Sequence, residues 1–442
     1  MVLKKNLRIY IIDVYLRLVM SKQRLDNYNY MKILTNWVDK KDIFHKDFVW
    51  PRQMEIHLPS NKEIACDFDC FYCQGCKLDM SLGMDEKKTL KLMEKIGSNT
   101  FEYYIYGGAY TEPLLNPHFM DFMRLTKKLN AHFGIHSNGS QLKKLQEKDD
   151  FCTELVSLME SKYDYFSCSL DGGTPESHMK TKNIKYDAWT DIIEGIKILV
   201  DEREKQKSKG SIRVAYLLNK WNSSIEELSN FIILMKDIKV DSLRFSIPYA
   251  HYGNEIEKVQ NYKQKVENKE HLKFKTLLEP YMSKSKDEKP FIFYFAPVNQ
   301  DVDRMLDENY KQCAYTYYQT TMGSSGHIYR CSSIATPSFD YGILGKQPET
   351  VEEFKKMIEI SQDKEFHCHT CIHSTARCNR MALEVNSEWN AYYKPNNKPA
   401  KREKTIYVGP KNKAFGKYVY KDEQLRWNQK NKIIYTDKVK KI

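Results

Sequence analysis

The stretch Met54-Glu-Ile-His-Leu58 is followed closely by Cys66-Asp-Phe-Asp-Cys70-Phe-Tyr-Cys73. The first part is a short run typical of a β-strand, and the second places three cysteines in the loop that follows it. Thiolates hold iron–sulfur clusters, and a cubane cluster normally takes four of them. Three thiolates in one loop leave one iron open to a substrate or cofactor. A structural zinc ion is the alternative, but it prefers four ligands and has only Cys76 nearby as the fourth.

Working outward from this strand, short apolar, aromatic or β-branched runs alternate with amphipathic stretches between residues 54 and 250. The predicted strands are 54–58, 101–106, 132–136, 165–170, 212–218 and 242–247. The predicted helices are 85–96, 116–129, 142–160, 188–204 and 224–236. Connections in such βα units are right-handed, so we expect parallel strands. Six units are too few to close an eight-stranded barrel, and the sequence therefore predicts an α/β fold with a partial (β/α)6 TIM-type barrel.

The rest of the 442-residue chain divides by composition. We expect an N-terminal helical extension (1–50), the barrel (51–250), a charged connecting segment (251–312), a small cysteine-rich α+β domain (313–393) and a basic tail (394–442). Within the connecting segment, 291–296 is a clear strand candidate. The 20 Phe, 30 Tyr and 6 Trp exclude a mostly disordered or fibrous protein.

The net charge of +12 is concentrated in the tail, which holds 15 Lys or Arg against four acidic residues. The body of the chain is therefore nearly neutral, and its charge does not indicate a nucleic-acid-binding protein. The apolar run at 7–20 is broken by Arg8, Asp13 and Arg17, so it does not predict a membrane span. It also lacks the features of a secretory signal, and we expect a cytoplasmic protein without membrane partners.

Most of the eleven cysteines lie in two groups, and an odd number without a secretory signal argues against a disulfide framework. The second group is Cys313, Cys331, Cys368, Cys371 and Cys378. Cys152 and Cys168 stand alone and are predicted to be small core residues.

The first group resembles the hallmark of the radical S-adenosylmethionine (SAM) enzymes, Cys-x3-Cys-x-aromatic-Cys, with Tyr72 as the aromatic residue. Three further segments resemble family motifs: Gly107-Gly108-Ala-Tyr-Thr-Glu112-Pro113, Ser137-Asn138-Gly139 and Ser169-Leu-Asp171-Gly. Each lies at the end of a predicted strand. Barrels of this type carry their ligand sites at the carboxyl ends of the strands, so the four motifs are expected to converge there.

The resemblance implies that Cys66, Cys70 and Cys73 are catalytic ligands of a [4Fe–4S] cluster whose free iron binds SAM. It implies that SAM is cleaved reductively to a 5′-deoxyadenosyl radical, which abstracts hydrogen from a substrate. The electron would come from a reductase such as flavodoxin or ferredoxin. Arg213 is a weaker contact candidate. The implied SAM contacts are Tyr72, Gly107, Gly108, Thr111, Glu112, Ser137, Asn138, Ser169, Asp171 and Asn219.

The second cysteine group resembles the SPASM domain and its shorter Twitch form, which hold auxiliary iron–sulfur clusters. The larger form uses seven cysteines for two clusters, so five cysteines favour one auxiliary [4Fe–4S] cluster. Its ligands are expected to be Cys313, Cys331, Cys368 and Cys371, with Cys378 as the alternative fourth ligand. A structural zinc site with nearby histidines remains the competing interpretation.

Three functions stay open at this point. The favoured one is oxidation or modification of a small molecule such as a sugar or aminoglycoside, because one auxiliary cluster has precedent in Twitch-bearing dehydrogenases of alcohols. The second is a maturase for a peptide or protein side chain, although fifty residues before the first strand are short for a recognition module. The third is a non-catalytic iron–sulfur or zinc-binding protein.

Overall fold

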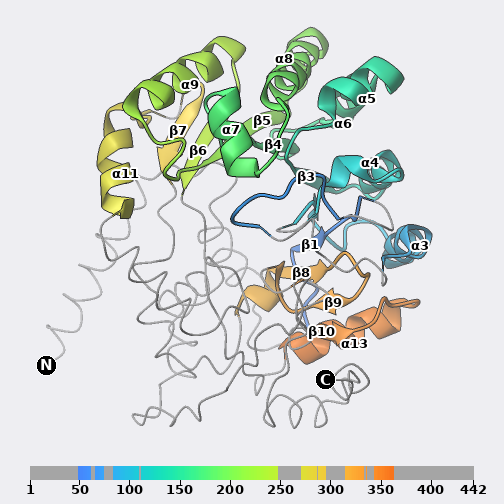
Figure 1. Ribbon diagram of the computed structural model, residues 1–442. Coiled ribbons are helices and arrows are strands. Elements are labelled where there is room, and N and C mark those ends of the chain that lie inside the picture. The colour runs from blue at the N-terminus through green and yellow to red at the C-terminus, as the bar shows by residue number, and fades with distance from the viewer. Residues whose placement is uncertain are drawn as a thin grey trace, which may run out of the picture.

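The computed structural model describes residues 48–60, 65–73, 83–108, 111–246, 270–285, 287–294, 314–332, 335 and 343–362 (Figure 1). The strands are β1 Gln53–Ile56, β2 Tyr103–Tyr106, β3 His132–Ser137, β4 Tyr165–Ser169, β5 Ser211–Leu217, β6 Ser242–Ser246, β7 Phe291–Tyr294, β8 Gln319–Met322, β9 Ile328–Tyr329 and β10 Ile343–Gly345. The helices are α3 Glu86–Ile96, α4 Phe119–Lys128, α5 Leu142–Asp149, α6 Phe151–Leu158, α7 Pro175–Lys182, α8 Trp189–Gln206, α9 Ile225–Ile238, α11 Glu270–Leu278 and α13 Val351–Gln362, with short turns η2 Pro113–Leu115, η3 Glu279–Tyr281 and η5 Ala314–Tyr317.

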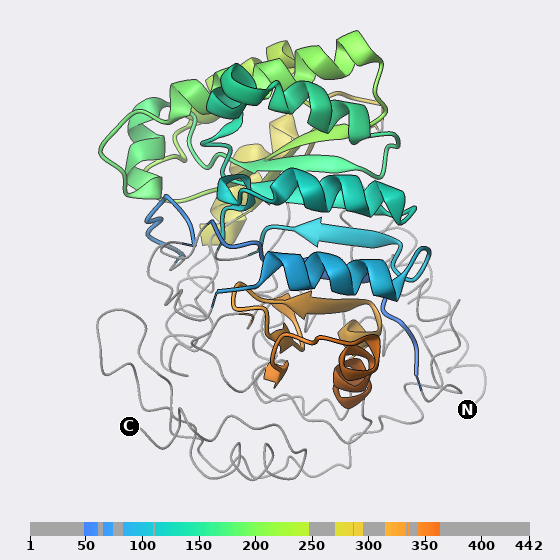
Figure 2. The same cartoon turned by 90° about the vertical axis from the view of Figure 1, so that its right-hand side faces the viewer.

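One sheet contains all of these strands, in the order β10-β9-β8-β1-β2-β3-β4-β5-β6-β7. Every neighbouring pair from β8 through β1 to β7 is parallel, and β9 and β10 add antiparallel pairs at one edge. Helices cover one face of the curved sheet, and the side view shows them stacked along the strands (Figures 1 and 2). The predicted α/β class with a parallel, partial-barrel sheet is confirmed.

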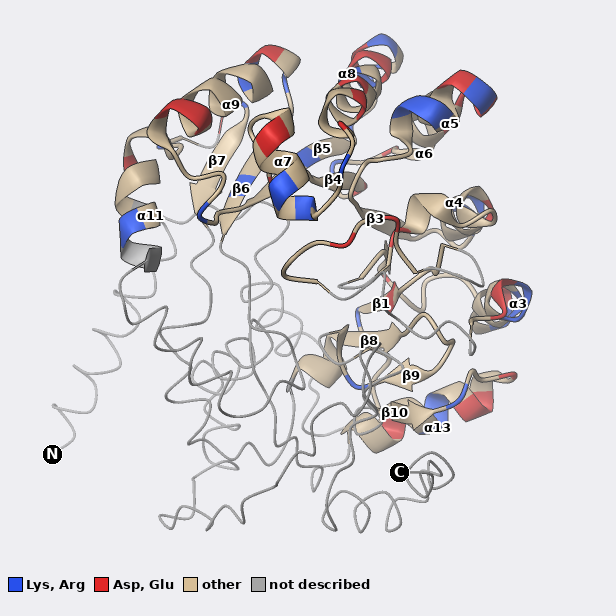
Figure 3. Cartoon of the chain, viewed as in Figure 1, with Lys and Arg blue, Asp and Glu red and all other residues tan. Residues whose placement is uncertain are grey.

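Side-chain alternation along the strands separates an apolar face from a polar face. On β5, the alternate residues Ile212, Val214 and Tyr216 join the large core that the helices cover. Arg213, between them, instead places its guanidinium 4.0 Å from the centre of the Tyr165 ring. Because alternate side chains of a strand point to opposite faces, the helix-covered face is the core. Charged residues lie mainly on the covering helices (Figure 3).

The predicted helix over 142–160 is two helices, because the chain breaks at Asp150. This residue adopts a left-handed conformation with φ of +51°, which Asp tolerates better than most residues. The side chain of Gln146 then accepts hydrogen bonds from the backbone amides of Cys152 and Thr153 at the start of α6.

Helix α7 was not predicted. Its sequence Pro-Glu-Ser-His-Met-Lys-Thr-Lys has no continuous apolar stripe, yet its start is well defined. Thr174 and Ser177 form a capping box, and Pro175 occupies the first helical position. The helix ends at Asn183 in the left-handed conformation.

The sheet of the barrel continues into the segment for which a small separate domain was predicted. β8 pairs with β1 through Gln53↔Gln319 to Ile56↔Met322. The side chain of Gln347 contacts the start of α3, accepting from the amide of Asp85 and donating to the hydroxyl of Thr89. Of the second cysteine group, Cys331 alone lies within the described residues.

The predicted N-terminal helical extension up to residue 47, most of the charged connecting segment and the basic tail also lie outside the described residues. None of the helices in the described part of the chain has the length and hydropathy needed to cross a membrane.

Candidate active site

The three cysteines of the first group lie in the thiol loop, defined here as residues 65–73, which follows β1. Cys70 is buried, and Cys66 and Cys73 are half-buried. The loop turns tightly between the last two, because the amide of Cys73 donates to the carbonyl of Cys70 at 2.9 Å. Burial raises the pKa of the Cys66 thiol well above its ordinary value and also raises that of Cys70. Burial therefore favours the protonated form of both thiols.

The three thiols share one loop but do not meet at one point. Cys66 Sγ lies 3.7 Å from the side-chain amide of Asn138, whereas Cys70 is buried beside Lys182. Within the described ranges, no three His, Cys, Asp or Glu side chains are close enough together to hold one metal ion.

The glycines after β2 are required by protein packing. Gly107 has φ of +90°, and a Cβ there would lie 2.1 Å from the carbonyl oxygen of His136. A Cβ on Gly108 would lie 2.1 Å from the imidazole of His57. These glycines therefore allow the end of β2 to approach its neighbouring strands, whatever contact with a ligand they also make.

Glu112 joins the end of β2 to the end of β3. It is buried and accepts hydrogen bonds from the Leu114 amide at 3.0 Å, the Ser137 hydroxyl at 2.7 Å and the Asn138 amide at 2.6 Å. Burial raises the pKa of Glu112 to about 8. The hydroxyl of neighbouring Thr111 is buried and has no hydrogen-bond partner among the described residues, so it is suited to bind a polar ligand.

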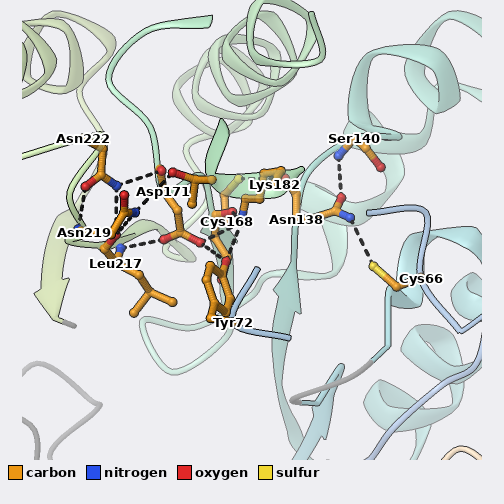
Figure 4. A network of polar contacts seen from close by, with 12 residues as sticks. Cys66, Tyr72, Asn138, Ser140, Cys168, Asp171, Lys182, Leu217, Asn219 and Asn222 are labelled. Carbon is orange, nitrogen blue, oxygen red and sulfur yellow. Dashed lines mark hydrogen bonds and ion pairs between the residues drawn. The ribbon is translucent and has the colours of Figure 1, made fainter. Parts of the chain in front are cut away.

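Asn138 connects the end of β3 to the thiol loop (Figure 4). Its side-chain amide donates to Asp67 Oδ1 at 2.7 Å, and its side-chain oxygen accepts from the Ser140 amide at 2.8 Å. The Ser140 hydroxyl donates to the other carboxylate oxygen of Asp67 at 2.6 Å. The loop after β3 thus fixes the backbone next to Cys66.

Asp171, after β4, is fully buried at the centre of a second network (Figure 4). Its Oδ2 accepts from Tyr72 at 2.5 Å and from Lys182 at 2.6 Å, and its Oδ1 accepts from the Leu217 amide at 2.7 Å. Its backbone carbonyl accepts from the side chain of Asn222 at 3.0 Å. The Asp171 carboxylate is therefore engaged entirely within the protein.

The remaining predicted contacts lie around this network. Asn219 donates to the Thr181 hydroxyl and to the Leu217 carbonyl, both at 3.2 Å, and Ser169 offers its carbonyl to Lys182 at 2.8 Å. The structure thus brings the predicted residues together at the carboxyl ends of the strands, in two protein-internal networks that include Asp67 and Tyr72 of the thiol loop, respectively.

Sequence reasoning missed Lys182 and Asn222. The Thr174-Pro175 pair is a recognisable helix start and would have predicted α7, but no local signal indicates that the last turn of α7 returns to the end of β4. Asn222 had no comparable signal, because an Asn in a loop is more often an ordinary turn residue.

Cys152 and Cys168 are fully buried in the core, and Cys331 is buried just after β9. Cys168 lies beside the site, because its thiol donates to the Asn138 carbonyl at 3.6 Å. Cys313, Cys368, Cys371 and Cys378 lie outside the described residues.

Comparison with known proteins places this site within one segment. Residues 64–231 match the family model described as the Radical SAM superfamily. No curated protein matches the chain.

Solved structures with similarity to the chain include three with low sequence identity. SuiB of Streptococcus suis bound to S-adenosylmethionine is 14% identical with a TM-score of 0.41, and the match covers 70% of this chain and 64% of SuiB. Native anSMEcpe with bound AdoMet and Cp18Cys peptide is 14% identical with a TM-score of 0.41, covering 76% of this chain and 85% of the other. TYW1 with a lysine-pyruvate adduct bound is 15% identical with a TM-score of 0.31, and the match covers 62% of this chain and 93% of TYW1.

Proposed function

We propose, from the fact that residues 64–231 are a radical SAM domain, that this protein is an enzyme that reductively cleaves SAM and uses the product to modify a substrate. The proposal is supported by three cysteine thiols in one loop at the carboxyl end of β1, inside that domain. Cys66, Cys70 and Cys73 would hold a [4Fe–4S] cluster. With SAM bound, such a cluster supplies one-electron cleavage to a 5′-deoxyadenosyl radical that removes a hydrogen atom from the substrate.

The residues of the site fit this cofactor by their chemistry. Three reduced cysteines are the donor type that iron–sulfur clusters require. The buried hydroxyl of Thr111, without a partner in the described residues, supports a polar ligand beside the glycine-rich loop. Since the thiols are not gathered at one point, the loop must adjust its side chains when the cluster is assembled.

The protein's own residues keep the surroundings of the thiol loop in place. Glu112 holds the ends of β2 and β3 together through three hydrogen bonds. Asp67, within the loop, accepts hydrogen bonds from Asn138 and Ser140. These contacts orient the backbone around Cys66 before any ligand arrives, which lowers the entropic cost of forming the site.

For the substrate, we favour a small molecule rich in hydrogen-bonding groups, such as a sugar or aminoglycoside. The sheet face away from the helices carries polar side chains from neighbouring strands. Glu55 lies 2.6 Å from Nε2 of His57 and accepts from Gln319 at 2.7 Å, and Arg213 stacks over the Tyr165 ring. Such a face suits a substrate with many polar groups, because each group can replace its hydrogen bond to water by a hydrogen bond to the protein.

An auxiliary [4Fe–4S] cluster, held by Cys331 together with members of the second cysteine group outside the described residues, would take up the second electron of an oxidation. The first electron would come from a reductase such as flavodoxin or ferredoxin, for which dithionite substitutes in an assay.

The decisive experiment compares the wild type with a variant in which Cys66, Cys70 and Cys73 are all replaced by Ala. After anaerobic reconstitution, we expect about eight iron atoms per wild-type chain and about four in the variant, as two [4Fe–4S] clusters require. We expect release of 5′-deoxyadenosine from SAM by the wild type and none by the variant. Cys152→Ala, a core cysteine distant from the loop in sequence, should keep both properties.

Cleavage of SAM by the triple variant at the wild-type rate would refute the proposal. A second outcome is about four irons and one zinc in the wild type, with no iron but the same zinc in the triple variant. That outcome would leave the barrel chemistry but replace the auxiliary cluster by a structural zinc site. Incubating the active enzyme separately with amino sugars and with short peptides then distinguishes the two substrate classes by which compound changes mass.

A further inference from the structure

Lys182, on the last turn of α7, is a buried cation that no sequence motif singled out. Lys182 is only 1% exposed to solvent. The ammonium group donates to Asp171 Oδ2 at 2.6 Å, to the Ser169 carbonyl at 2.8 Å and to the Tyr72 hydroxyl at 2.9 Å. A lysine ammonium has three N–H donors, so these three oxygens use all of them.

The charge of Lys182 is retained in spite of its burial. Burial is the largest single effect and lowers the pKa of the amine, but Asp171, Cys70 and Cys168 together raise the pKa above its ordinary value. Removing an ion pair from water costs several kcal/mol per ion, and only good geometry with further hydrogen bonds offsets that cost. Here both partners are saturated, because Asp171 also accepts from Tyr72 and from the Leu217 amide.

Tyr72 connects the Lys182–Asp171 ion pair to the thiol loop. The residue lies between Cys70 and Cys73, and its hydroxyl both donates to Asp171 at 2.5 Å and accepts from Lys182 at 2.9 Å. Two hydrogen bonds to a buried ion pair fix the position of the phenol. The ring in turn fixes the backbone that carries the two cysteines.

The same end of α7 contacts the loop at two further points. The Phe71 amide donates to the Thr181 carbonyl at 3.4 Å, and the Asn183 side chain donates to Asp69 at 2.9 Å. Three successive residues of the helix end, from Thr181 to Asn183, thus contact the loop between Asp69 and Tyr72. Lys182 is the central one of these residues and is almost fully buried (Figure 4).

We propose that Lys182 is a positioning residue that holds Tyr72, and through it the segment from Cys70 to Cys73, in a fixed shape before the cluster is assembled. That these cysteines bind a cluster belongs to the proposed function. That Lys182 holds the loop is a property of the iron-free chain and is tested there.

The test measures the alkylation rate of each cysteine in the full-length, iron-free protein by mass spectrometry. In Lys182→Met, we expect the rate at Cys70 to rise by about tenfold or more, because local opening exposes it without global unfolding. Loss of the nearby positive charge alone would slow the reaction, since the thiolate is the reactive form. A faster rate at Cys70 therefore reports opening of the loop. Cys152, fully buried in α6, serves as the internal reference and should keep its rate.

Lys180→Met is the matched control. It removes an exposed lysine of the same helix, which is paired with Glu176. The alkylation rates of Cys70 and Cys152 should therefore not change. Equal rates at Cys70 in Lys182→Met and the wild type would overturn the proposal. A parallel rise at Cys70 and Cys152 would also overturn it, because it would assign Lys182 a role in general stability.

Tyr72→Phe supplies an independent variant if Lys182→Met does not fold. It deletes one hydroxyl and leaves the Lys182–Asp171 pair in place. We expect a faster rate at Cys70 alone, and in the double variant a rate no higher than in Lys182→Met, because both changes break the same link. An unchanged Cys70 rate in Tyr72→Phe would refute the link through the phenol. None of these outcomes depends on iron or SAM, so they are distinct from failure of the proposed function.

Discussion

At Gly108, just after β2, the backbone packs against the side chain of His57, which directly follows β1. The imidazole of His57 occupies the space that a Cβ would need, and its Nε2 lies 2.6 Å from Glu55. A glycine-rich segment after a strand was predicted from its sequence as a cofactor contact. The geometry adds a second reason for the glycine, which is contact within the protein.

We expect Gly108→Ala to lower the free energy of unfolding by about 1–3 kcal/mol, the usual cost of overpacking. Denaturant-induced unfolding of the purified protein measures this change. His57→Ala in the same background should restore part of the loss, because it removes the atoms that the new methyl group meets. If Gly108→Ala keeps wild-type stability and only SAM binding weakens, packing is not the reason for this glycine.

At the residue scale, the sequence motifs predicted where several side chains lie, while their roles as cluster ligands and SAM contacts stay predictions. Cys66, Tyr72, Glu112, Asn138 and Asp171 do lie together at the ends of consecutive strands. The sequence could not predict that Asp171 is saturated by protein groups, because its partner Lys182 comes from a helix with no amphipathic pattern. Buried polar networks depend on tertiary distances that spacing does not encode.

At the scale of elements, Asp164 links α4, β3 and the turn before β4. Its fully buried carboxylate accepts from Lys127 at 2.7 Å, from the Phe133 amide at 3.1 Å and from the Ser161 amide at 3.0 Å. Burial raises its pKa, but hydrogen bonds from His132 and Lys127 outweigh this and hold the pKa below its ordinary value.

We expect Asp164→Asn to lower the free energy of unfolding by about 2–4 kcal/mol at pH 7, because a buried charged partner is lost. A depressed folded pKa stabilises the protein above the unfolded pKa of about 3.9, and this contribution disappears as the pH falls through the lower folded value. The difference between wild type and variant should therefore shrink in acid. Denaturant titrations of both proteins at pH 7 and below pH 4 measure this difference in the free energy of unfolding.

Asp149→Asn is the control for this prediction. Its carboxylate is half-exposed in an ion pair with Lys148, and such pairs contribute about 0–1 kcal/mol. A similar loss of stability in both variants would show that the effect is not specific to the buried network.

Element boundaries were predictable to within a few residues for strands of the barrel, because β-branched and aromatic runs are distinctive. β8, β9 and β10 have only four, two and three residues and were not predicted. β8 is placed in the sheet by pairing with β1, a contact between distant parts of the sequence that local patterns cannot reveal, and β9 and β10 are added through β8.

At the scale of the whole molecule, the barrel sheet includes the strands next to Cys331. The Ser324 carbonyl accepts from the Met84 amide at 2.9 Å, which adds a further link between this region and the start of α3. A cofactor bound near Cys331 would therefore be attached to the barrel through continuous backbone pairing.

If the proposed function is correct, we expect Cys331→Ala to retain SAM cleavage to 5′-deoxyadenosine while losing turnover of the true substrate, because the barrel cysteines remain and the proposed auxiliary cluster loses a ligand. Iron per chain should fall from about eight to about four. Iron analysis and 5′-deoxyadenosine release measure both effects. Full substrate turnover with the reduced iron content would make the second site structural rather than redox-active.

The pairing of β1 with β8 also has a consequence for how the chain folds during synthesis. β1 spans Gln53–Ile56, and the strand that covers one of its edges spans Gln319–Met322. While the ribosome makes the intervening residues, that edge of β1 lacks its final neighbour, and exposed strand edges are templates for aggregation. Contacts between such distant segments also slow folding. The nascent barrel is therefore most vulnerable, and chaperone binding most valuable, until the last parallel strand has emerged.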